Sequence, residues 1–375
     1  MNEKAISTKQ FVLLVFLLSI AVKTFLMPAL VLRTVGRDGI FTIAFFIAVE
    51  FLCLAFIVIV CKRNPDKTFF EIMEQCLGKV FSKIVFVVLF IFSFSKAVII
   101  IGEIKAFFVA VMYQDINWAI MVLPLVVLVL FLSRKSLRAL GRTAELITPA
   151  VLISTLILGS LLLPEFDTSE LLPILPDGMG EVTRGIDRFV LWFGDTTTLL
   201  LFMGNIKIGK GFAIGTLVAK LVATILTAFF CIVLFSAYGN VSELVDYGNN
   251  VSNLTQLSLG SQDYGRFDLL FYCIWLLSVL IKLASTFILS VKCAHHTIKV
   301  GVEGKKAIAL SVILYGLVAI AFNNEETAFL YATSLVRYIF YPSIYLLPLL
   351  TLICALIKYQ PNYHKVKNNE QKANE

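Results

Sequence analysis

Long apolar segments separated by short polar connections make up most of the chain. These segments run for about 17–28 residues and do not alternate at period two, as a half-buried strand would. About 20 apolar residues are needed to cross a bilayer as a helix, and only helices or closed barrels satisfy their backbone groups in lipid. The pattern predicts ten membrane-spanning helices, at approximately 10–32, 39–61, 83–112, 117–132, 144–163, 186–204, 211–238, 268–291, 306–322 and 331–357.

Composition supports this interpretation. Of the 375 residues, 59% are hydrophobic and 15% are charged, whereas about a quarter of the residues are charged in a typical soluble domain. The excess apolar surface has to face lipid. The predicted fold class is therefore an all-α polytopic membrane protein.

The basic residues alternate between the two sets of connections. One set carries 21 of the 32 lysines and arginines, and the other carries five. Positive residues mark the cytoplasmic side of a membrane protein, so both termini are predicted to be cytoplasmic. The net charge of +7 then reflects orientation in the lipid bilayer and does not indicate a nucleic-acid partner.

Ten helices divide into two halves of five. We expect one membrane domain over residues 1–363, with a first repeat at about 8–163, a second at about 186–357, and a polar cytoplasmic tail at 364–375. Because five is odd, the second half enters the membrane from the opposite side. This topology permits a five-plus-five inverted repeat, in which the first helix of each half is broken and its unwound backbone binds the ligand.

The sequence interrupts both of those helices. The first has Lys23 and Thr24 near its middle, followed by Pro28, and the sixth contains Gly194 and Asp195 followed by three threonines. Proline and glycine also occur in continuous spanning helices as simple kinks, so kinks remain the alternative interpretation.

Nine charged residues fall inside the predicted spans, apart from the span ends, where a charge is costly and faces the protein interior, pairs or snorkels. Lys105, Lys220 and Arg337 lie toward span ends and are expected to snorkel. Glu50 and Lys96 are central, and an interhelical ion pair of Glu50 with a lysine is expected. The remaining four are Lys23, Glu103, Asp195 and Lys282. Lys282 shares a helix face with Ser278, Ser285 and Thr286, which predicts a polar stripe along the eighth span.

Several segments together resemble a known family. They are "ISTKQ" before the first span, "NPDKTFFEIMEQCLGKVFSKIV" after the second, "LGRTAELITP" at the fifth, "LLPILPDGMGEV" before the sixth, "GRFDLLFYCIWLLSVLIKLAS" at the eighth and "RYIFYPSIYLLPLL" at the tenth. Leu172, Pro173, Leu175 and Gly178 form the most specific element. In order and spacing, over nearly the whole chain, these segments resemble the GerAB-type spore germination proteins, which are B subunits of spore germinant receptors.

The resemblance implies a fold and a role. That family belongs to the amino acid–polyamine–organocation transporter superfamily, with a LeuT-like fold whose helices one and six are broken. The implied role is to sense a small nutrient, such as an amino acid, in the inner membrane of the spore, together with an A subunit and a C lipoprotein. The alternative is active cation-coupled secondary transport of amino acids or amines.

The resemblance also implies where a ligand would bind. The expected ligand-binding residues are Ala21, Val22, Lys23, Thr24, Glu103, Gly194, Asp195, Thr196, Thr197 and Lys282. The chain departs from the family in carrying Lys23 where small residues are usual and Asp195 where glutamate is frequent. We expect Lys23 to pair with Asp195 or to share a ligand with it, while a purely structural role remains open.

Nothing in the sequence predicts an enzyme. It contains no Walker motif and no serine or cysteine with a base in reach, and the seven cysteines show no metal or redox spacing. We therefore expect no catalytic residues, no metal site and no cofactor.

Overall fold

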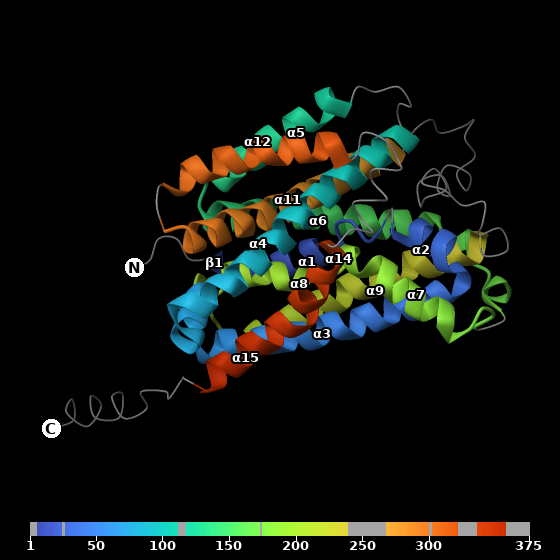
Figure 1. The fold of residues 1–375 in the computed structure, drawn as a ribbon. Coiled ribbons are helices and arrows are strands. Elements are labelled where there is room, and N and C mark those ends of the chain that lie inside the picture. Colours follow the sequence, from blue (N-terminus) through green and yellow to red (C-terminus); the bar gives the residue numbers. More distant parts are fainter. Residues whose placement is uncertain are drawn as a thin grey trace.

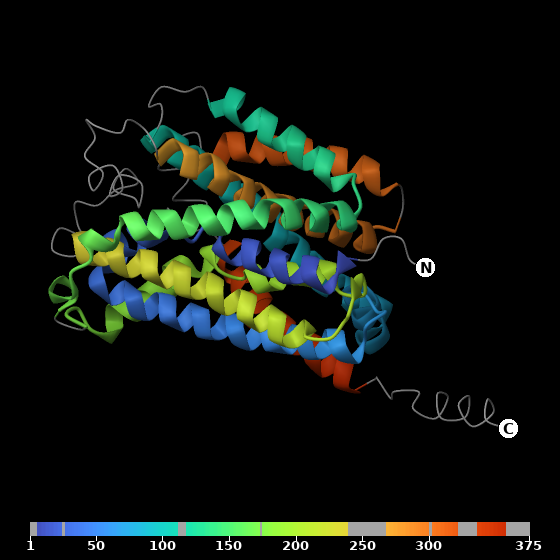
Figure 2. The ribbon, with the colours of Figure 1, turned by 180° about the vertical axis from the view of Figure 1, so that it is seen from behind.

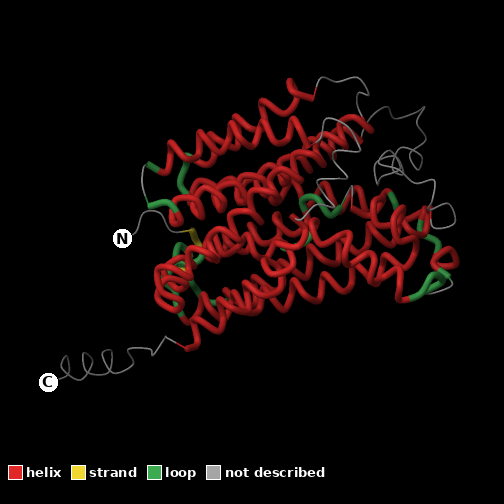
Figure 3. Tube along the Cα trace, in the orientation of Figure 1, coloured by secondary structure: helices red, strands yellow, loops and turns green. Residues whose placement is uncertain are grey.

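The computed structural model describes residues 6–24, 27–111, 118–172, 175–238, 268–299, 302–321 and 336–357. These residues form a bundle of helices with one short pair of strands (Figures 1 and 3). The beginning of the chain at β1 and the end of α15 lie at the same end of the bundle (Figure 1). The tail at 364–375 is outside the described residues.

The helices follow the predicted apolar segments closely. Their bounds are α1 Thr8–Ile20, α2 Met27–Val35, α3 Gly39–Arg63, α4 Phe69–Val111, α5 Trp118–Ser133, α6 Leu137–Leu161, α7 Met179–Phe189, α8 Asp195–Thr198, α9 Phe212–Tyr238, α11 Asp268–Thr297, α12 Glu303–Ala321, α14 Val336–Tyr341 and α15 Leu347–Ile357. A π-helical turn at Pro342–Leu346 joins the last two, and short 3-10 turns include Gly36–Asp38, Val190–Trp192 and Leu199–Phe202.

Six helical stretches in the described part are long and apolar enough to cross a membrane. They are Met27–Arg63, Phe69–Lys105, Leu137–Leu161, Phe212–Tyr238, Leu270–Thr297 and Val336–Ile357. Two shorter apolar helices, Thr8–Ile20 and Ile120–Ser133, accompany them. The protein is therefore a multi-pass integral membrane protein. In Figure 2, α1 packs against α6 and α9, while α5 and α12 pack together along one edge of the bundle.

The first span is interrupted at the predicted place. Helix α1 ends at Ile20, Ala21 to Thr24 form turns, and α2 begins at Met27. Pro28 lies in the first turn of α2, where a missing backbone N–H costs no helical hydrogen bond.

The sixth span is also interrupted. After α7 and a 3-10 turn, Phe193 has an extended backbone and Gly194 has φ 85°, and α8 begins at Asp195. A Cβ at position 194 would lie 2.6 Å from the Ile344 side chain, which belongs to the π-helical turn. Glycine therefore satisfies both the left-handed backbone and the close approach.

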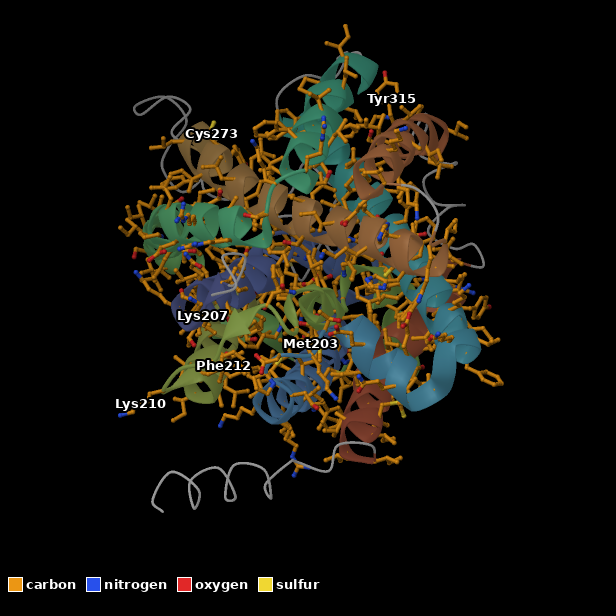
Figure 4. The ribbon with its side chains drawn as sticks, turned by 90° about the vertical axis from the view of Figure 1, so that its left-hand side faces the viewer. Met203, Lys207, Lys210, Phe212, Cys273 and Tyr315 are labelled. Carbon is orange, nitrogen blue, oxygen red and sulfur yellow. The ribbon has the colours of Figure 1, made fainter. Side chains whose placement is uncertain are left out.

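A two-stranded parallel pair joins the two interrupted segments at one end of the bundle. β1 (Ile6–Ser7) pairs with β2 (Ile206–Lys207), which lies between α8 and α9. Ser7 caps α1 in a capping box with Gln10. Figure 4 views this end, where Lys207 and Lys210 lie beside the start of α9 and Lys210 points away from the molecule.

At the same end of the bundle, two of the segments on which the family resemblance rests contact each other. Lys9 and Gln10 both contact Glu145 of α6, at 2.6 and 3.3 Å. A Cβ at Gly141 would lie 3.1 Å from Ile6 and 3.2 Å from Gln10, so β1 and α1 approach α6 closely. The motifs "ISTKQ" and "LGRTAELITP" thus hold α1 against α6.

Helix α4 contains a sharp change of direction. Gly78 has φ 79°, which separates the amphipathic segment at 69–77 from the long span. Phe69 and Met73 are fully buried, whereas Val80, beyond the kink, is exposed. Phe70 stacks on His296 near the end of α11, with 4.0 Å between ring centroids. This amphipathic helix therefore packs against the bundle through its apolar face.

The segment before α7 packs against the turn between α2 and α3. The guanidinium of Arg37 donates to the Leu172 carbonyl, and the Asp177 amide donates to the Asp38 carboxylate at 3.1 Å. Gly178, at φ 83°, precedes the first residue of α7. Pro173 is outside the described residues.

Candidate functional site

The two helix interruptions meet in the middle of the bundle, where they are surrounded by charged side chains. Short helix α8 lies beside α1 and α3 there (Figure 1). Six charged residues form a continuous network at this point, and each is at most 4% exposed. We call this network the central charge cluster; its members are Lys23, Glu50, Lys96, Asp195, Lys220 and Lys282.

Glu50 of α3 is one of the two carboxylates in the cluster. Its Oε1 accepts hydrogen bonds from the backbone amides of Gly194 at 3.1 Å and Asp195 at 3.3 Å. Its Oε2 binds the ammonium groups of Lys23, at 2.7 Å, and Lys220. The side chain therefore supplies the hydrogen bonds that the interrupted sixth span cannot make within its own helix.

Asp195 is the other carboxylate. Its Oδ2 lies 3.0 Å from the Lys23 ammonium, and its Oδ1 lies 2.8 Å from Lys282 and 3.1 Å from Lys96. One carboxylate thus faces three ammonium groups from three other segments of the chain. The Lys96 ammonium also donates to the Phe193 carbonyl.

Lys23 bridges the two carboxylates. It follows the C-terminal end of α1, where the helix dipole favours a cation. Its ammonium also lies 4.6 Å from the centroid of the Phe193 ring, at a distance typical of a cation–π contact. Phe193 stacks on Phe46 with 4.0 Å between centroids. The ion pair between Lys23 and Asp195 that the sequence predicts is present.

Other polar side chains form hydrogen bonds at the two interrupted spans. The indole N–H of Trp275 in α11 donates to the Ala21 carbonyl, and the Thr24 hydroxyl donates to the Ile20 carbonyl at 3.0 Å. Thr196 donates to the Glu50 carbonyl at 3.3 Å, and Thr197 to the Ser343 carbonyl at 2.9 Å. The contacts of Trp275 and Thr24 thus satisfy part of the interrupted first span within the protein.

Glu103 of α4 lies next to the cluster and is 7% exposed. Its charged neighbours are Lys282, Lys96 and Asp195. The indole of Trp192 interacts with this carboxyl group, whose Oε1 accepts no well-formed hydrogen bond within the described structure. Glu103 therefore places an unsatisfied carboxyl oxygen beside the ammonium groups.

All of the predicted site residues lie in the described part of the chain and are buried. Ala21 and Thr24 contribute through backbone and hydroxyl contacts, and Val22 is buried nearby. The polar face predicted for the eighth span is also buried, at Ser278, Lys282, Ser285 and Thr286. Whether any of these residues binds a ligand stays a prediction.

One sequence prediction is wrong. Lys220 was expected to snorkel toward the membrane surface, but it is 2% exposed and bound to Glu50 and to the Ser19 hydroxyl at 3.2 Å. Its position two turns into α9 made both outcomes compatible with the sequence. Arg337, which was also expected to snorkel, lies near the start of α14. Its guanidinium group pairs with the Asp187 carboxylate at 2.9 Å.

Sequence reasoning also missed several members of the site. Trp192 and Trp275 were not singled out, and neither was the role of Glu50 in binding the amides of the sixth span. A signal for Glu50 was present, because it is an isolated carboxylate in the otherwise apolar segment 39–61. The two tryptophans give no comparable signal, since tryptophan is common in membrane helices.

Two small cavities flank the cluster, and each has a volume of about 10 Å³, close to the room for one water molecule. One is lined by Lys23, Glu50 and Lys220 together with Ser19, Thr224 and Thr227. The other adjoins Thr24, Trp275 and Ser278. The charged side chains themselves thus fill most of the space between the helix interruptions.

Gly194→Ala is expected to destabilise the protein by roughly 2–6 kcal/mol. A left-handed backbone costs a residue with a Cβ about 1–3 kcal/mol, and the contact with Ile344 adds an overpacking cost of about 1–3 kcal/mol. Thermal unfolding of the purified protein measures the change. Gly316→Ala in α12 is the control, because a Cβ there meets nothing within 4 Å. Equal effects of the two substitutions would contradict the packing argument.

The arrangement of helices defines the class of protein. The fold is similar to that of MHP1, a nucleobase-cation-symport-1 family transporter, in a closed conformation with bromovinylhydantoin bound; the TM-score is 0.52 at 11% identity, over 93% of this chain and 78% of that one. The chain is thus a membrane protein with a transporter-like fold. Residues 5–327 match the family model described as "Spore germination protein", and the chain belongs to this spore germination family.

A curated relative agrees with the family. The chain is 25% identical over 185 residues to the spore germination protein YndE of Bacillus subtilis (strain 168). The match covers 48% of this chain and 49% of YndE, so it spans about half the length of that relative.

Proposed function

We propose that the protein is the nutrient-sensing membrane subunit of a spore germinant receptor, which binds a small molecule at the central charge cluster. The observation that carries this proposal is the meeting of two interrupted helices around buried charges, in a spore germination protein with a transporter-like fold. Interrupted helices expose backbone groups and dipole ends to a ligand at the middle of the membrane. From the resemblance, the proposed ligand is a small nutrient such as an amino acid, and the proposed partners are an A subunit and a C lipoprotein.

The proposal includes a topology. Ten spans in a five-plus-five inverted repeat, with both termini in the cytoplasm, would form a single membrane domain. The interruptions of the first and sixth spans and the placement of β1 and the end of α15 at one end of the bundle support it. The spore inner membrane is the proposed location.

Cation-coupled transport of amino acids or amines is the second candidate function, favoured by the similarity to a transporter fold. Against it, both carboxylates at the interruption already hold lysine ammonium groups. A coupling cation would have to displace one of these. Sensing without cation-coupled uptake is therefore the function that the geometry supports better.

Glu103→Gln should change nutrient sensing without changing the amount of protein. The substitution keeps the shape of a side chain whose Oε1 makes no hydrogen bond, but it removes the charge next to Lys282. In spores of the encoding bacterium, the nutrient concentration for half-maximal germination should shift several-fold, as measured by loss of refractility. Membrane levels should stay the same by immunoblot.

Glu145→Gln is the matched control, because Glu145 is an exposed glutamate that contacts Lys9. It should leave the response unchanged. Identical dose–response curves for Glu103→Gln and the original protein would reject nutrient binding at this site. Accumulation of labelled nutrient in proteoliposomes, driven by a cation gradient, would instead establish the transporter function.

A further inference from the structure

The central charge cluster contains more ammonium groups than carboxyl groups. Four lysines face Glu50 and Asp195, and Glu103 is the third carboxyl group beside them. Even with Glu103 ionised, one positive charge is left over; with Glu103 neutral, two are. All seven side chains are at most 7% exposed. Leaving a buried charge uncompensated is costly, particularly in a membrane protein.

The surplus is unevenly placed. Lys23 and Lys220 share the carboxylate of Glu50, and Lys23 has Asp195 as well. Lys96 and Lys282, by contrast, share the single oxygen Oδ1 of Asp195. Apart from this ion pair, the Lys282 ammonium makes no hydrogen bond in the described structure. The positive surplus therefore lies on the side of Lys282, toward Glu103 and Trp192.

The hydrogen-bonding groups on this side suit an anion. Beyond its ion pair with Asp195, the Lys282 ammonium has donors to spare in the described structure. A protonated Glu103 would add another donor. An added monovalent anion would take over one of the two ammonium groups that share Asp195 Oδ1, and it would remove one unit of the surplus positive charge.

The same cluster disfavours a ligand that carries its own ammonium group. The oxygens of Glu50 and Asp195 that face the interruption are already bound by lysines and backbone amides. A ligand ammonium would have to displace Lys23 and would add to the positive surplus. In this chain the Lys23 ammonium occupies the place that an amino group would take between the two carboxylates.

We propose that the central charge cluster binds a small monovalent anion without an ammonium group, such as a short carboxylate or a halide, in preference to a zwitterionic amino acid. The anion binds the Lys282 ammonium beside Glu103. This inference rests on the proposed nutrient-binding role of the site and specifies its ligand class.

Thermal unfolding of the purified full-length protein in detergent tests the proposal. The buffer contains a bulky sulfonate as its anion, and lactate, acetate, chloride or alanine is added at constant ionic strength. Lactate and alanine form the decisive pair, because they differ by a hydroxyl in place of an ammonium group. We expect lactate, chloride or both to raise the unfolding temperature saturably, by several degrees, with at least about ten-fold higher apparent affinity than alanine.

Lys282→Met supplies the second arm of the test. Because it removes surplus positive charge, it should raise the unfolding temperature in the sulfonate buffer and abolish the effect of added anions. Lys96→Met should act in the same direction, more weakly, since Lys96 also donates to the Phe193 carbonyl. Lys83→Met is the control, because Lys83 lies on α4 like Lys96 but is exposed; it should change neither property.

Each outcome bears on the proposal. A response to lactate and acetate identifies a carboxylate site, and a response to chloride alone identifies a halide site; both support it. No stabilisation by any added anion, equal affinity for alanine and lactate, or a Lys282→Met protein that is destabilised would overturn it. Anion binding in vitro without any effect of Glu103→Gln on germination would instead reject the sensing role and leave the anion site standing.

Discussion

Asp195→Asn is expected to destabilise the protein by about 3–5 kcal/mol, the usual cost of removing one partner from a buried ion pair. The amide is nearly isosteric with the carboxylate, so no cavity forms, but three ammonium groups lose their shared counter-ion. This is a large fraction of the roughly 5–15 kcal/mol that stabilises a typical protein. Thermal unfolding and the level of protein in membranes should both fall sharply.

The expected loss is specific to the buried charge. Asp187→Asn is the matched control, because Asp187 pairs with Arg337 at a partly exposed position, where an ion pair contributes about 1 kcal/mol or less. The double variant Asp195→Asn with Lys282→Met should be at least about 1 kcal/mol more stable than the sum of the two single effects predicts. Purely additive effects of the two substitutions would show that the pair is not coupled.

The structure also predicts that removing the charge of Lys23 and removing the charge of Asp195 have unequal effects on stability. Lys23→Met leaves Asp195 with two lysines and Glu50 with Lys220, so neither carboxylate is stranded. It should therefore cost less than Asp195→Asn. From the sequence we expected Lys23 to pair with Asp195 or to share a ligand with it, and did not expect the two further lysines that the structure places on Asp195.

Glu50→Gln is expected to have the second large effect, again about 3–5 kcal/mol. Glutamine can still accept from the amides of Gly194 and Asp195 through its oxygen, but its NH₂ group would then face the ammonium groups of Lys23 and Lys220. Thermal unfolding of the purified protein measures the loss. Faster hydrogen exchange at the amides of residues 194 and 195 should accompany it, because the interruption loses its charged acceptor.

Two comparisons make this prediction specific. Glu145→Gln changes the same residue type at an exposed position next to Lys9 and should cost about 1 kcal/mol or less. Adding Lys220→Met to Glu50→Gln should restore part of the stability, since Lys220 loses the carboxylate with which it pairs, whereas Lys23 keeps Asp195. Unchanged stability of Glu50→Gln alone would mean that the carboxylate charge is not needed to hold Lys23 and Lys220.

The site explains how a membrane protein tolerates charges near the middle of its first span. Lys23 lies at the end of a helix, between two carboxylates and over an aromatic ring. The carboxylates come from α3 and α8, and one of them also binds the backbone that the interrupted sixth span leaves exposed. The same groups therefore stabilise the interruption and supply the chemistry of the candidate site.

The sequence by itself determined the class of the protein and the places where its helices are interrupted. Both depend on local properties: the length of an apolar segment decides whether a helix can cross lipid, and Pro28, Gly194 and the adjacent charges act on their own backbone. The family resemblance rests on such local motifs as well. The packing of "ISTKQ" against "LGRTAELITP" then shows why two distant motifs occur in the same chain.

Tertiary structure alone decided which charges meet. Glu50 is 27 residues from Lys23 and 170 residues from Lys220, and no helical periodicity relates positions so far apart. Whether Lys220 reaches the membrane surface or turns inward depends on which face of α9 packs against α1 and α3. The surplus of positive charge can be counted only once those faces are known. Whether a charge inside a membrane protein is compensated depends on the side chains that surround it and not on its position in the chain.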